Sequence, residues 1–298
     1  MGGRSGRFLT VLLLLVLAAC GSGEDPDPAG PVTTIRFASY DFPENQTLTE
    51  VYAEAVRRQG LPVSVQHGVG TREVVSPALQ QGVVDVVVDY LGTALAFARP
   101  SATALSRRPE AMYAVLSRTM GGRGVLVLTP SEAEDQNGFA VTRQFAQARD
   151  VSRLSDLTDL APDLNFGGPP ECPDRPFCLQ GLARVYGLEF AEVVSMPSRA
   201  ATVEALVSGL IDIGLLETTD ARLSTAPVTL LVDDRMLQPP ENVVPLVRRA
   251  AIDRWGEELR TALNGVSARL TTADLVALNR SVELEGLTPE EAAARWWS

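Results

Sequence analysis

Apolar runs of strand length alternate with segments of helical spacing along most of this chain. Val83–Val88 and Ile211–Leu216 are short and rich in Val, Ile and Leu, so they predict buried strands. From Gln46 to Gln59 apolar residues recur at helical spacing, and Gly60-Leu61-Pro62 predicts the end of that helix. Further strands are predicted at residues 35–38, 63–65, 125–128, 139–141 and 228–232, and further helical segments at 74–81, 109–119, 154–157, 180–186, 201–207 and 253–297. The alternation indicates an α/β fold with a mainly parallel sheet.

One pattern occurs twice, 127 positions apart (205 − 78 = 217 − 90). Ala78–Asp85 and Ala205–Asp212 each predict the end of a helix, a glycine at its C-terminal cap and a buried strand. Tyr90 and Glu217 follow at the same distance and end the two strands. Because ligands of open α/β sheets collect beyond the carboxyl ends of such strands, we expect one of these residues on each wall of a cleft. The alternative is chance recurrence of a common helix–Gly–strand pattern.

Two interruptions of the pattern predict how the chain is divided. The sequence becomes polar at Thr129-Pro130-Ser131 and again at Asp233-Asp234, where we place two crossings between lobes. Lobe I is expected to comprise residues 33–130 plus 234–298, and lobe II residues 131–233. Two crossings form a hinge, and a hinged cleft closes around what it binds.

Missing residue types exclude several kinds of chemistry. The chain has no lysine, its 26 basic residues all being arginine, which excludes a Walker-type phosphate loop and a pyridoxal Schiff base. His67 is the only histidine, so a His-Glu-x-x-His zinc site cannot exist, and no Gly-x-Ser-x-Gly elbow accompanies it. We expect His67 in a turn, Gln66–Gly70, facing solvent or a ligand. The prediction is a protein that is not an enzyme and holds no cofactor and no metal.

The formal net charge of −11 argues against nucleic acid as a partner, because an acidic surface repels phosphate. The simpler interpretation is that acidity keeps the protein in solution. It says little about the charge of a ligand.

The first 32 residues predict export and anchoring. Arg4 and Arg7 precede the apolar run Phe8–Ala19, which is too short to span a bilayer core needing about 20 helical residues. Residues 1–19 therefore have the pattern of a signal peptide. Leu17-Ala18-Ala19-Cys20 resembles a lipobox, so Cys20 is expected to carry acyl chains, and residues 20–32 to form a flexible tether. The alternative is an ordinary signal peptide with an incidental cysteine. The predicted location is the extracytoplasmic face of the cell membrane, held by lipid alone.

Cys172 and Cys178 remain once Cys20 is assigned. Outside the cytoplasm an even pair of cysteines is most simply a disulfide. The ring between them is short and rich in proline, so it is expected to stiffen a loop and to direct Phe177 or Leu179.

Several stretches carry a family resemblance. Asp89–Leu95 is similar to the Glu-Tyr-Thr-Gly-Thr-Ala-Leu, and Asp41–Gln46 to the Asn-Phe-Thr-Glu-Gln, of the OpuAC-like substrate-binding proteins of ABC importers for quaternary amines. The resemblance covers roughly residues 35–249, with further matches at 181–188, 217–220 and 237–245. It implies a class II periplasmic-binding-protein fold, with two α/β lobes, a ligand cleft and a two-crossing hinge. It also implies an ABC permease and its ATPase as partners.

The resemblance further implies an aromatic cage that holds a trimethylammonium group by cation–π attraction. Tyr90 matches a cage tyrosine, and Thr71 and Thr93 match polar cleft positions. The chain departs from the family where Glu217 replaces a common tyrosine and Tyr40 a common lysine. The predicted ligand-binding residues are Tyr40, Thr71, Tyr90, Thr93, Phe177, Glu217 and Thr218.

The carboxylate of Glu217 favours a choline-like cation, a polyamine or a guanidinium compound over a zwitterionic betaine. Alternatives are that Glu217 is a solvated rim residue or the partner of an arginine in the other lobe, and that Tyr90 only packs in the core. The predicted function is a monomeric lipoprotein that captures a small cationic or zwitterionic nitrogenous solute for an ABC permease. Its alternatives are a ligand sensor of the same fold, which would present its state to a signalling protein, and a structural lipoprotein.

Overall fold

The computed structural model describes residues 1–2, 33–99 and 106–298, and the fold described below is that of the unit Thr33–Ser298. Cys20 and the predicted tether lie outside the described residues, as does the predicted signal peptide beyond residue 2.

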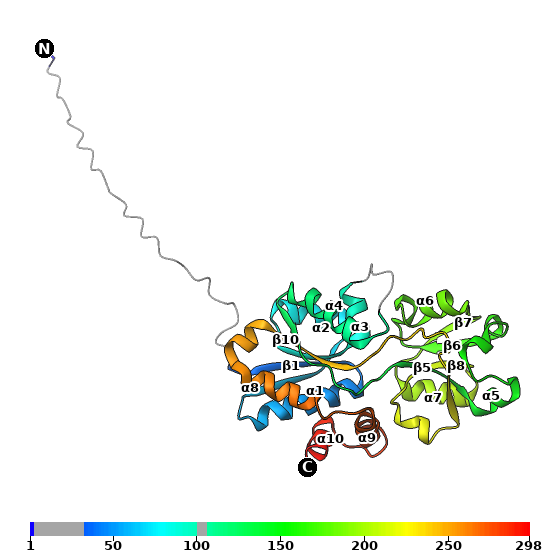
Figure 1. Ribbon diagram of the computed structural model, residues 1–298. Helices are drawn as coiled ribbons and strands as arrows, with labels where there is room; N and C mark the ends of the chain where they lie inside the picture. The colour runs from blue at the N-terminus through cyan, green and yellow to red at the C-terminus, as the bar shows by residue number, and fades with distance from the viewer. Residues whose placement is uncertain (3–32, 100–105) are drawn as a thin grey trace. The chain divides into compact units, whose positions relative to one another are not determined.

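Two five-stranded sheets form the framework of this unit (Figure 1). The first sheet contains β1 (Ile35–Tyr40), β2 (Val63–Gly70), β3 (Val86–Tyr90), β4 (Val125–Val127) and β10 (Val243–Arg248). The second contains β5 (Asn137–Thr142), β6 (Asn165–Gly168), β7 (Glu192–Ser195), β8 (Ile213–Glu217) and β9 (Val228–Leu231). Their strand orders are β2-β1-β3-β10-β4 and β7-β6-β8-β5-β9, which confirms two α/β lobes.

The two sheets share one plan. β1 pairs in parallel with β2 and β3, and β6 pairs in parallel with β7 and β8. β10 and β5 run antiparallel to β3 and β8 respectively, so each sheet is mixed where a mainly parallel one was expected. The reason is connectivity: β5 and β10 are the first strands after the chain crosses between sheets, so no βαβ crossover imposes a parallel direction on them.

The repeated pattern has the predicted structure in both lobes. α2 (Arg72–Gln81) ends at Gly82 with φ 80°, and α7 (Arg199–Ser208) ends at Gly209 with φ 74°. Glycine adopts this left-handed conformation without a Cβ clash, so it terminates both helices. The buried strands β3 and β8 follow directly.

Helices cover both faces of the first sheet. α1 (Pro43–Arg58), α8 (Arg249–Ser267) and α10 (Pro289–Trp296) share one apolar core on one face. On the other face, α2 packs with α3 (Leu91–Ala98) and α4 (Pro109–Gly121). The second lobe adds α5 (Arg143–Arg149) and α6 (Leu179–Gly181).

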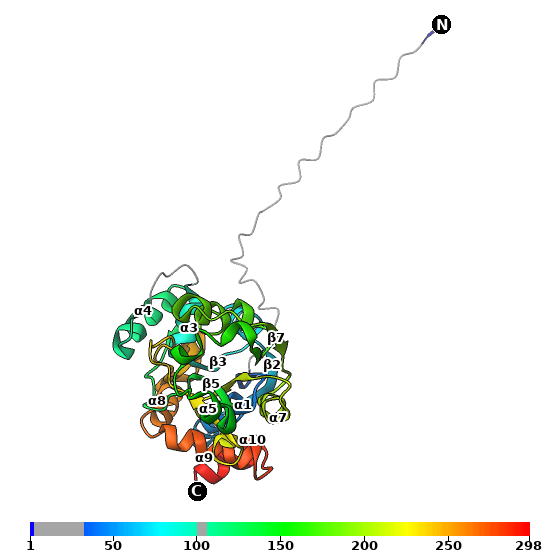
Figure 2. The ribbon, with the colours of Figure 1, turned by 90° about the vertical axis from the view of Figure 1, so that its right-hand side faces the viewer.

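α9 (Thr272–Glu283) connects the C-terminal helices to the second lobe. It lies beside α10 in both views (Figure 1, Figure 2) and contacts the short 3₁₀ helix Ala221–Ser224. Arg222 Nη1 lies 2.6 Å from Glu283 Oε2 across this contact. The C-terminal segment, predicted to complete lobe I, therefore also touches the other lobe.

Two segments of the chain, residues 128–136 and 232–242, connect the sheets. They meet at an antiparallel bridge between Glu134 and Asn242, and Asn242 Nδ2 donates to the carbonyl oxygen of Ser131 at 3.1 Å. The predicted crossings at 129–131 and 233–234 fall within these segments. The lobe boundaries drawn through them remain a proposal.

His67 lies in strand β2 and not in the predicted turn. β2 is the edge strand of its sheet and is only partly buried, so polar residues and glycines are tolerated there. Its sequence consequently lacks the continuous apolar run that marks the central strands.

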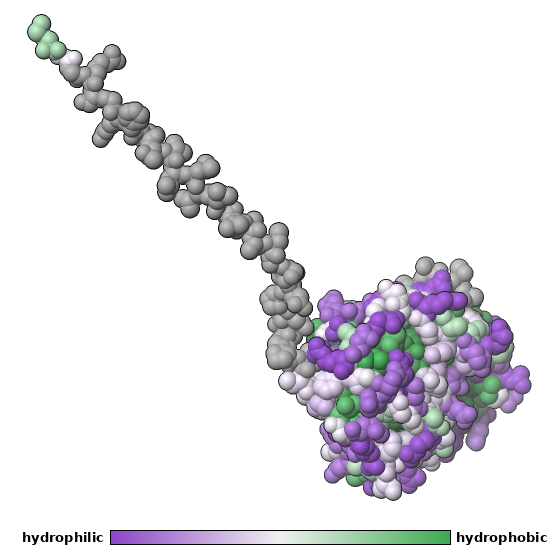
Figure 3. Space-filling view, turned by 60° about the vertical axis from the view of Figure 1, so that its left-hand side comes forward, coloured by the Kyte–Doolittle hydropathy of each residue, from purple (hydrophilic) through white to green (hydrophobic). Residues whose placement is uncertain are grey.

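The surface matches the charged composition. On the face in Figure 3, apolar side chains form small patches separated by polar ones. Among the described residues, no helix combines the length and the apolar character needed to cross a bilayer.

Candidate ligand-binding cleft

A cleft of about 780 Å³ lies between the lobes. Small-molecule sites typically occupy about 300–1,000 Å³, so this cleft suits a small ligand. Tyr90 at the end of β3 and Glu217 at the end of β8 both line it, as the carboxyl-end argument predicted. Thr93 and Phe177, also predicted from the sequence, line it too.

The other three predicted residues do not line the cleft. The Tyr40 hydroxyl is buried and donates to Asp89 at 2.6 Å. At the start of α2, the Thr71 hydroxyl donates to Glu73 at 2.7 Å. Thr218 Oγ1 lies beside a crossing segment, where it donates to Asp135 at 3.2 Å and accepts from a backbone N–H at 3.0 Å. Their hydroxyls are therefore engaged within the protein.

Three aromatic rings stack along lobe I. Tyr40 and Phe42 have centroids 6.2 Å apart, and Phe42 and Tyr90 have centroids 6.1 Å apart. Phe42 and Tyr90 line the cleft, while the ring of Tyr40 is covered by the guanidinium of Arg72 at 4.7 Å. The guanidinium of Arg72 thus already covers the ring of Tyr40. The aromatic side chains that line the cleft, and that a ligand can meet, are Phe42, Tyr90, Phe97 and Phe177. Phe42 was missed, although it lies within the matched stretch after β1.

Each copy of the repeat also brings an arginine to the cleft. Arg72 and Arg199 are the first residues of α2 and α7, at the same separation of 127 as Tyr90 and Glu217 (199 − 72 = 217 − 90). Arg72 donates to Asp89 at 2.6 and 2.9 Å. These arginines were missed, and extending the repeat by six residues would have revealed them (78 − 72 = 205 − 199).

Glu217 is paired within its own lobe. Arg199 Nε lies 2.6 and 2.7 Å from the two carboxylate oxygens of Glu217, and Arg199 Nη2 also contacts one of them. Partnership with an arginine was one of the alternatives for Glu217, but the arginine was expected in the other lobe. Because the pair has no net charge, Glu217 no longer acts as an isolated anion toward a ligand.

Behind Tyr90, two buried carboxyls converge on one hydroxyl. Thr219 Oγ1 lies 2.6 Å from Glu44 Oε2 and 2.8 Å from Asp135 Oδ1. A hydroxyl can donate only one hydrogen, so one of the carboxyls must itself be protonated and donate. Burial raises the pKa of Glu44, and burial together with the charges of Glu44 and Glu217 raises that of Asp135 well above its usual range.

Glu241 holds the side chain of Thr93. It accepts from the Thr93 hydroxyl at 2.5 Å and from the Thr93 backbone N–H at 3.0 Å. Burial raises the pKa of Glu241 to about 7. Thr93 therefore presents an engaged hydroxyl to the cleft it lines.

Cys172 and Cys178 are joined in the structure, and the ring between them forms part of the cleft wall. Within this ring, Arg175 Nη1 lies 2.9 Å from Glu73 Oε1 on α2 of the other lobe. The backbone oxygen of Phe177 accepts from Gln238 Nε2 at 2.9 Å. The disulfide loop is thus fixed next to the connecting segment 232–242 and makes a contact across the cleft.

Two α/β lobes on one plan, joined by a double crossing around a cleft of small-molecule size, define the class of two-lobed solute-binding proteins. The chain belongs to the OpuAC family, the substrate-binding domain of ABC-type glycine betaine transport systems, whose family model matches residues 33–298. The resemblance found in the sequence is thereby confirmed. Proteins of this family are extracytoplasmic components of ABC importers that bind small ligands and interact with the permease and ATPase; they are transport proteins, generally without enzymatic activity.

Curated relatives and solved structures support this assignment. A glycine-betaine-binding protein of Pseudomonas aeruginosa is 27% identical over 271 residues, covering 88% of this chain and 86% of its own. The carnitine transport binding protein OpuCC of Listeria monocytogenes is 25% identical over 290 residues, covering 91% and 89%. The crystal structure of a glycine betaine/carnitine/choline ABC transporter protein has a TM-score of 0.71 at 20% identity, covering 88% and 97%, and shares the fold.

Proposed function

We propose that this chain captures a small solute with a quaternary or otherwise cationic nitrogen and delivers it to an ABC permease. The observation that carries the proposal is the set of aromatic rings lining one cleft, namely Phe42, Tyr90, Phe97 and Phe177. Ring faces attract a desolvated cation by about 2 kcal/mol or more per contact, and a trimethylammonium group fits such a surface because it needs no hydrogen-bond partner.

Within this class, the Arg199–Glu217 pair favours a betaine-type zwitterion. A ligand carboxylate can accept from Arg199 in place of Glu217, while the cationic head stays against the rings. The names of two relatives, glycine betaine and carnitine binders, support the same class. A choline-like cation is the second candidate, favoured by the carboxylate of Glu217.

The predicted residues take two roles in this proposal. Tyr90, Thr93, Phe177 and Glu217 contact the ligand, since they line the cleft. Tyr40, Thr71 and Thr218 hold neighbouring groups in place, because their hydroxyls bond to Asp89, Glu73 and Asp135.

A thermal-shift panel tests the ligand class. Glycine betaine, carnitine and choline are compared with tert-butyl analogues of the same shape, in which an uncharged carbon replaces the ammonium nitrogen. The proposal expects stabilisation by at least one quaternary amine and none by its tert-butyl analogue. Equal shifts with choline and its neutral tert-butyl analogue, where no carboxylate is present, would contradict cation recognition.

We further propose that the protein is a monomer held at the extracytoplasmic face by acyl chains on Cys20. The support is the lipobox-like sequence ending at Cys20. Metabolic labelling with a radioactive fatty acid should mark the wild-type protein and not Cys20→Ser. Label retained in Cys20→Ser, or no label in either, would refute the anchor without affecting the ligand proposal.

A further inference from the structure

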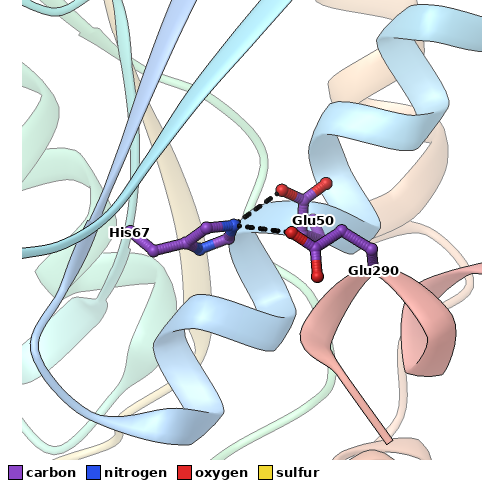
Figure 4. A group of neighbouring side chains, drawn as sticks. All are labelled: Glu50, His67 and Glu290. Atoms are coloured by element: carbon purple, nitrogen blue, oxygen red, sulfur yellow. Dashed lines mark hydrogen bonds and ion pairs between the residues drawn. The ribbon is translucent and has the colours of Figure 1, made fainter.

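Three metal-ligating side chains meet on lobe I, and none of them lines the cleft. His67 Nε2 in β2 lies 2.9 Å from Glu50 Oε1 in α1 and 3.2 Å from Glu290 Oε1 in α10. Figure 4 shows the imidazole nitrogen pointing at both carboxylates. The ligating atoms of the three residues all lie within 4.8 Å of one another.

A single hydrogen on His67 Nε2 cannot form a full hydrogen bond with both carboxylates. Nε2 carries at most one hydrogen, so two carboxylate oxygens must share it. When the hydrogen is on Nδ1 instead, the lone pair of Nε2 faces two anions. A divalent cation at the same point would accept electron pairs from all three atoms at once. We propose that Glu50, His67 and Glu290 bind a divalent transition-metal ion, independently of the solute proposed for the cleft.

The distances are close to those of a metal site. Zinc bonds of about 2.0 Å to nitrogen and oxygen in tetrahedral geometry place two ligand atoms about 3.3 Å apart. The observed nitrogen–oxygen separations of 2.9 and 3.2 Å are within a few tenths of an ångström of that value. The two carboxylate oxygens lie within 4.8 Å of each other, and movement of the half-exposed Glu290 side chain can bring them to the same spacing.

A neighbouring arginine orients the inner carboxylate. Arg57 Nη1 lies 2.8 Å from Glu50 Oε2, which leaves Glu50 Oε1 directed at His67. Such outer partners fix a ligand's direction and are a regular part of metal sites. The Glu50 side chain is 2% exposed, whereas those of His67 and Glu290 are 29% and 55% exposed. The site thus has a buried base, an entrance from solvent and room for water as a further ligand.

The donor set selects among cations. One imidazole nitrogen with two carboxylates suits Zn²⁺ and related transition ions, whereas Mg²⁺ and Ca²⁺ prefer oxygen ligands alone. The site is therefore expected to select a transition-metal ion.

The sequence alone did not predict this site. The expectation of no metal was based on the presence of a single histidine and did not consider carboxylates from distant parts of the chain. The carboxylates come from positions 17 residues before and 223 residues after His67, which only the fold brings together (67 − 50 = 17).

An ion here would connect the C-terminal helix α10 to the first helix and the second strand of lobe I. α10 would be joined to α1 and β2, and the adjacent α9 carries Asn279 and Glu283, which contact Thr219 and Arg222 of lobe II. The metal should therefore stabilise the helix pair that bridges the lobes, and its removal should lower the melting temperature.

Zinc titration of the purified protein, prepared with a histidine-free tag and treated with chelator, tests the site. Calorimetry should show one Zn²⁺ per chain, and Zn²⁺ should raise the melting temperature while Mg²⁺ and Ca²⁺ do not. His67→Ala and the more conservative Glu290→Gln should each weaken Zn²⁺ binding at least about 10-fold, since loss of even an outer partner costs about 10- to 100-fold.

Glu54→Gln is the matched control. Glu54 lies on α1 beside Glu50 and pairs with Arg57 and Arg58. This variant should keep the wild-type Zn²⁺ affinity. The proposal is overturned if the wild type binds no stoichiometric Zn²⁺, or if His67→Ala and Glu290→Gln bind it as tightly as the wild type.

Discussion

The hydroxyl of Tyr90 donates a 2.6 Å hydrogen bond to Oε1 of Glu44, whose other oxygen accepts one from Thr219 at 2.6 Å. Tyr90 lines the cleft at the end of β3, while Thr219 follows β8 of the other lobe. Asn279 of α9 donates to the same carboxyl oxygen at 2.7 Å. The cleft wall that carries Tyr90 is therefore connected, through one buried carboxyl, to lobe II and to the C-terminal helices.

The two parts of Tyr90 should have separate effects. Tyr90→Ala removes the ring and should weaken solute binding about 5- to 30-fold, or about 1–2 kcal/mol. Tyr90→Phe keeps the ring, so affinity should fall much less. It should instead lower the free energy of unfolding by about 1–3 kcal/mol, because the buried Glu44 loses a donor. Calorimetric titration and urea unfolding measure the two effects.

Tyr113→Phe is the control, because Tyr113 does not line the cleft and its hydroxyl donates to the carbonyl oxygen of Val127. Its solute affinity should equal that of the wild type. If Tyr90→Ala and Tyr90→Phe lose equal affinity, the hydroxyl and not the ring supports binding.

The charged pair at the cleft should discriminate between ligands. Arg199→Gln should weaken glycine betaine about 10- to 100-fold, as expected for a lost charge-assisted hydrogen bond, and should not weaken choline. Glu217→Gln should weaken choline more than glycine betaine. Titration of both ligands into both variants measures this, with Arg184→Gln, another arginine lining the cleft, as the control. Parallel losses for the two ligands would mean that the pair serves only the structure.

The buried carboxyls should make the protein more stable at mildly acidic pH. Burial raises the pKa of Glu44 and Asp135, and it raises that of Glu241 to about 7. In the unfolded chain these groups have ordinary pKa values near 4, so between about pH 5 and 7 the folded state binds more protons. Raising the pH through this window should lower the free energy of unfolding.

Melting temperatures recorded from pH 5 to pH 8 measure this dependence. Glu241→Gln cannot take up a proton at this position, so its melting temperature should vary less with pH. A wild-type melting temperature that rises from pH 5 to pH 8 would show that these carboxyls do not govern the dependence.

The disulfide should be complete in the exported protein. Free-thiol labelling of non-reduced protein lacking Cys20 should find no thiol, since Cys172 and Cys178 are joined. Cys172→Ser together with Cys178→Ser should lower the free energy of unfolding by about 2 kcal/mol through loop entropy. Two labelled thiols in the wild type would refute the pairing.

The sequence predicted those helices and strands whose ends depend on neighbouring residues alone. Gly82 and Gly209 end their helices because glycine adopts the left-handed conformation without a Cβ clash, so both repeated units were predictable. β10 was not predicted, since Pro245 interrupts its pattern and its pairing with β3 joins residues far apart in sequence. The edge strand β2 was predicted too short because it is half-exposed.

The candidate site was predictable only in part, because several of its contacts join residues far apart in the sequence. Tyr90 and Glu217 follow from strand ends, which a sequence reveals. The partner of Glu217 lies 18 residues away at a helix start, and the contact between Glu44 and Thr219 spans 175 residues. Such pairings depend on how the lobes pack, which no local pattern encodes.

Mass spectrometry of the ligand carried through native purification is the most direct test of the proposed ligand class. The protein is released from membranes without denaturant, desalted, unfolded, and the freed small molecules are identified. We expect a compound with a quaternary or cationic nitrogen, present in the wild type and depleted in Tyr90→Ala. A sugar or an anionic acid without a cationic nitrogen, retained equally by both proteins, would contradict it.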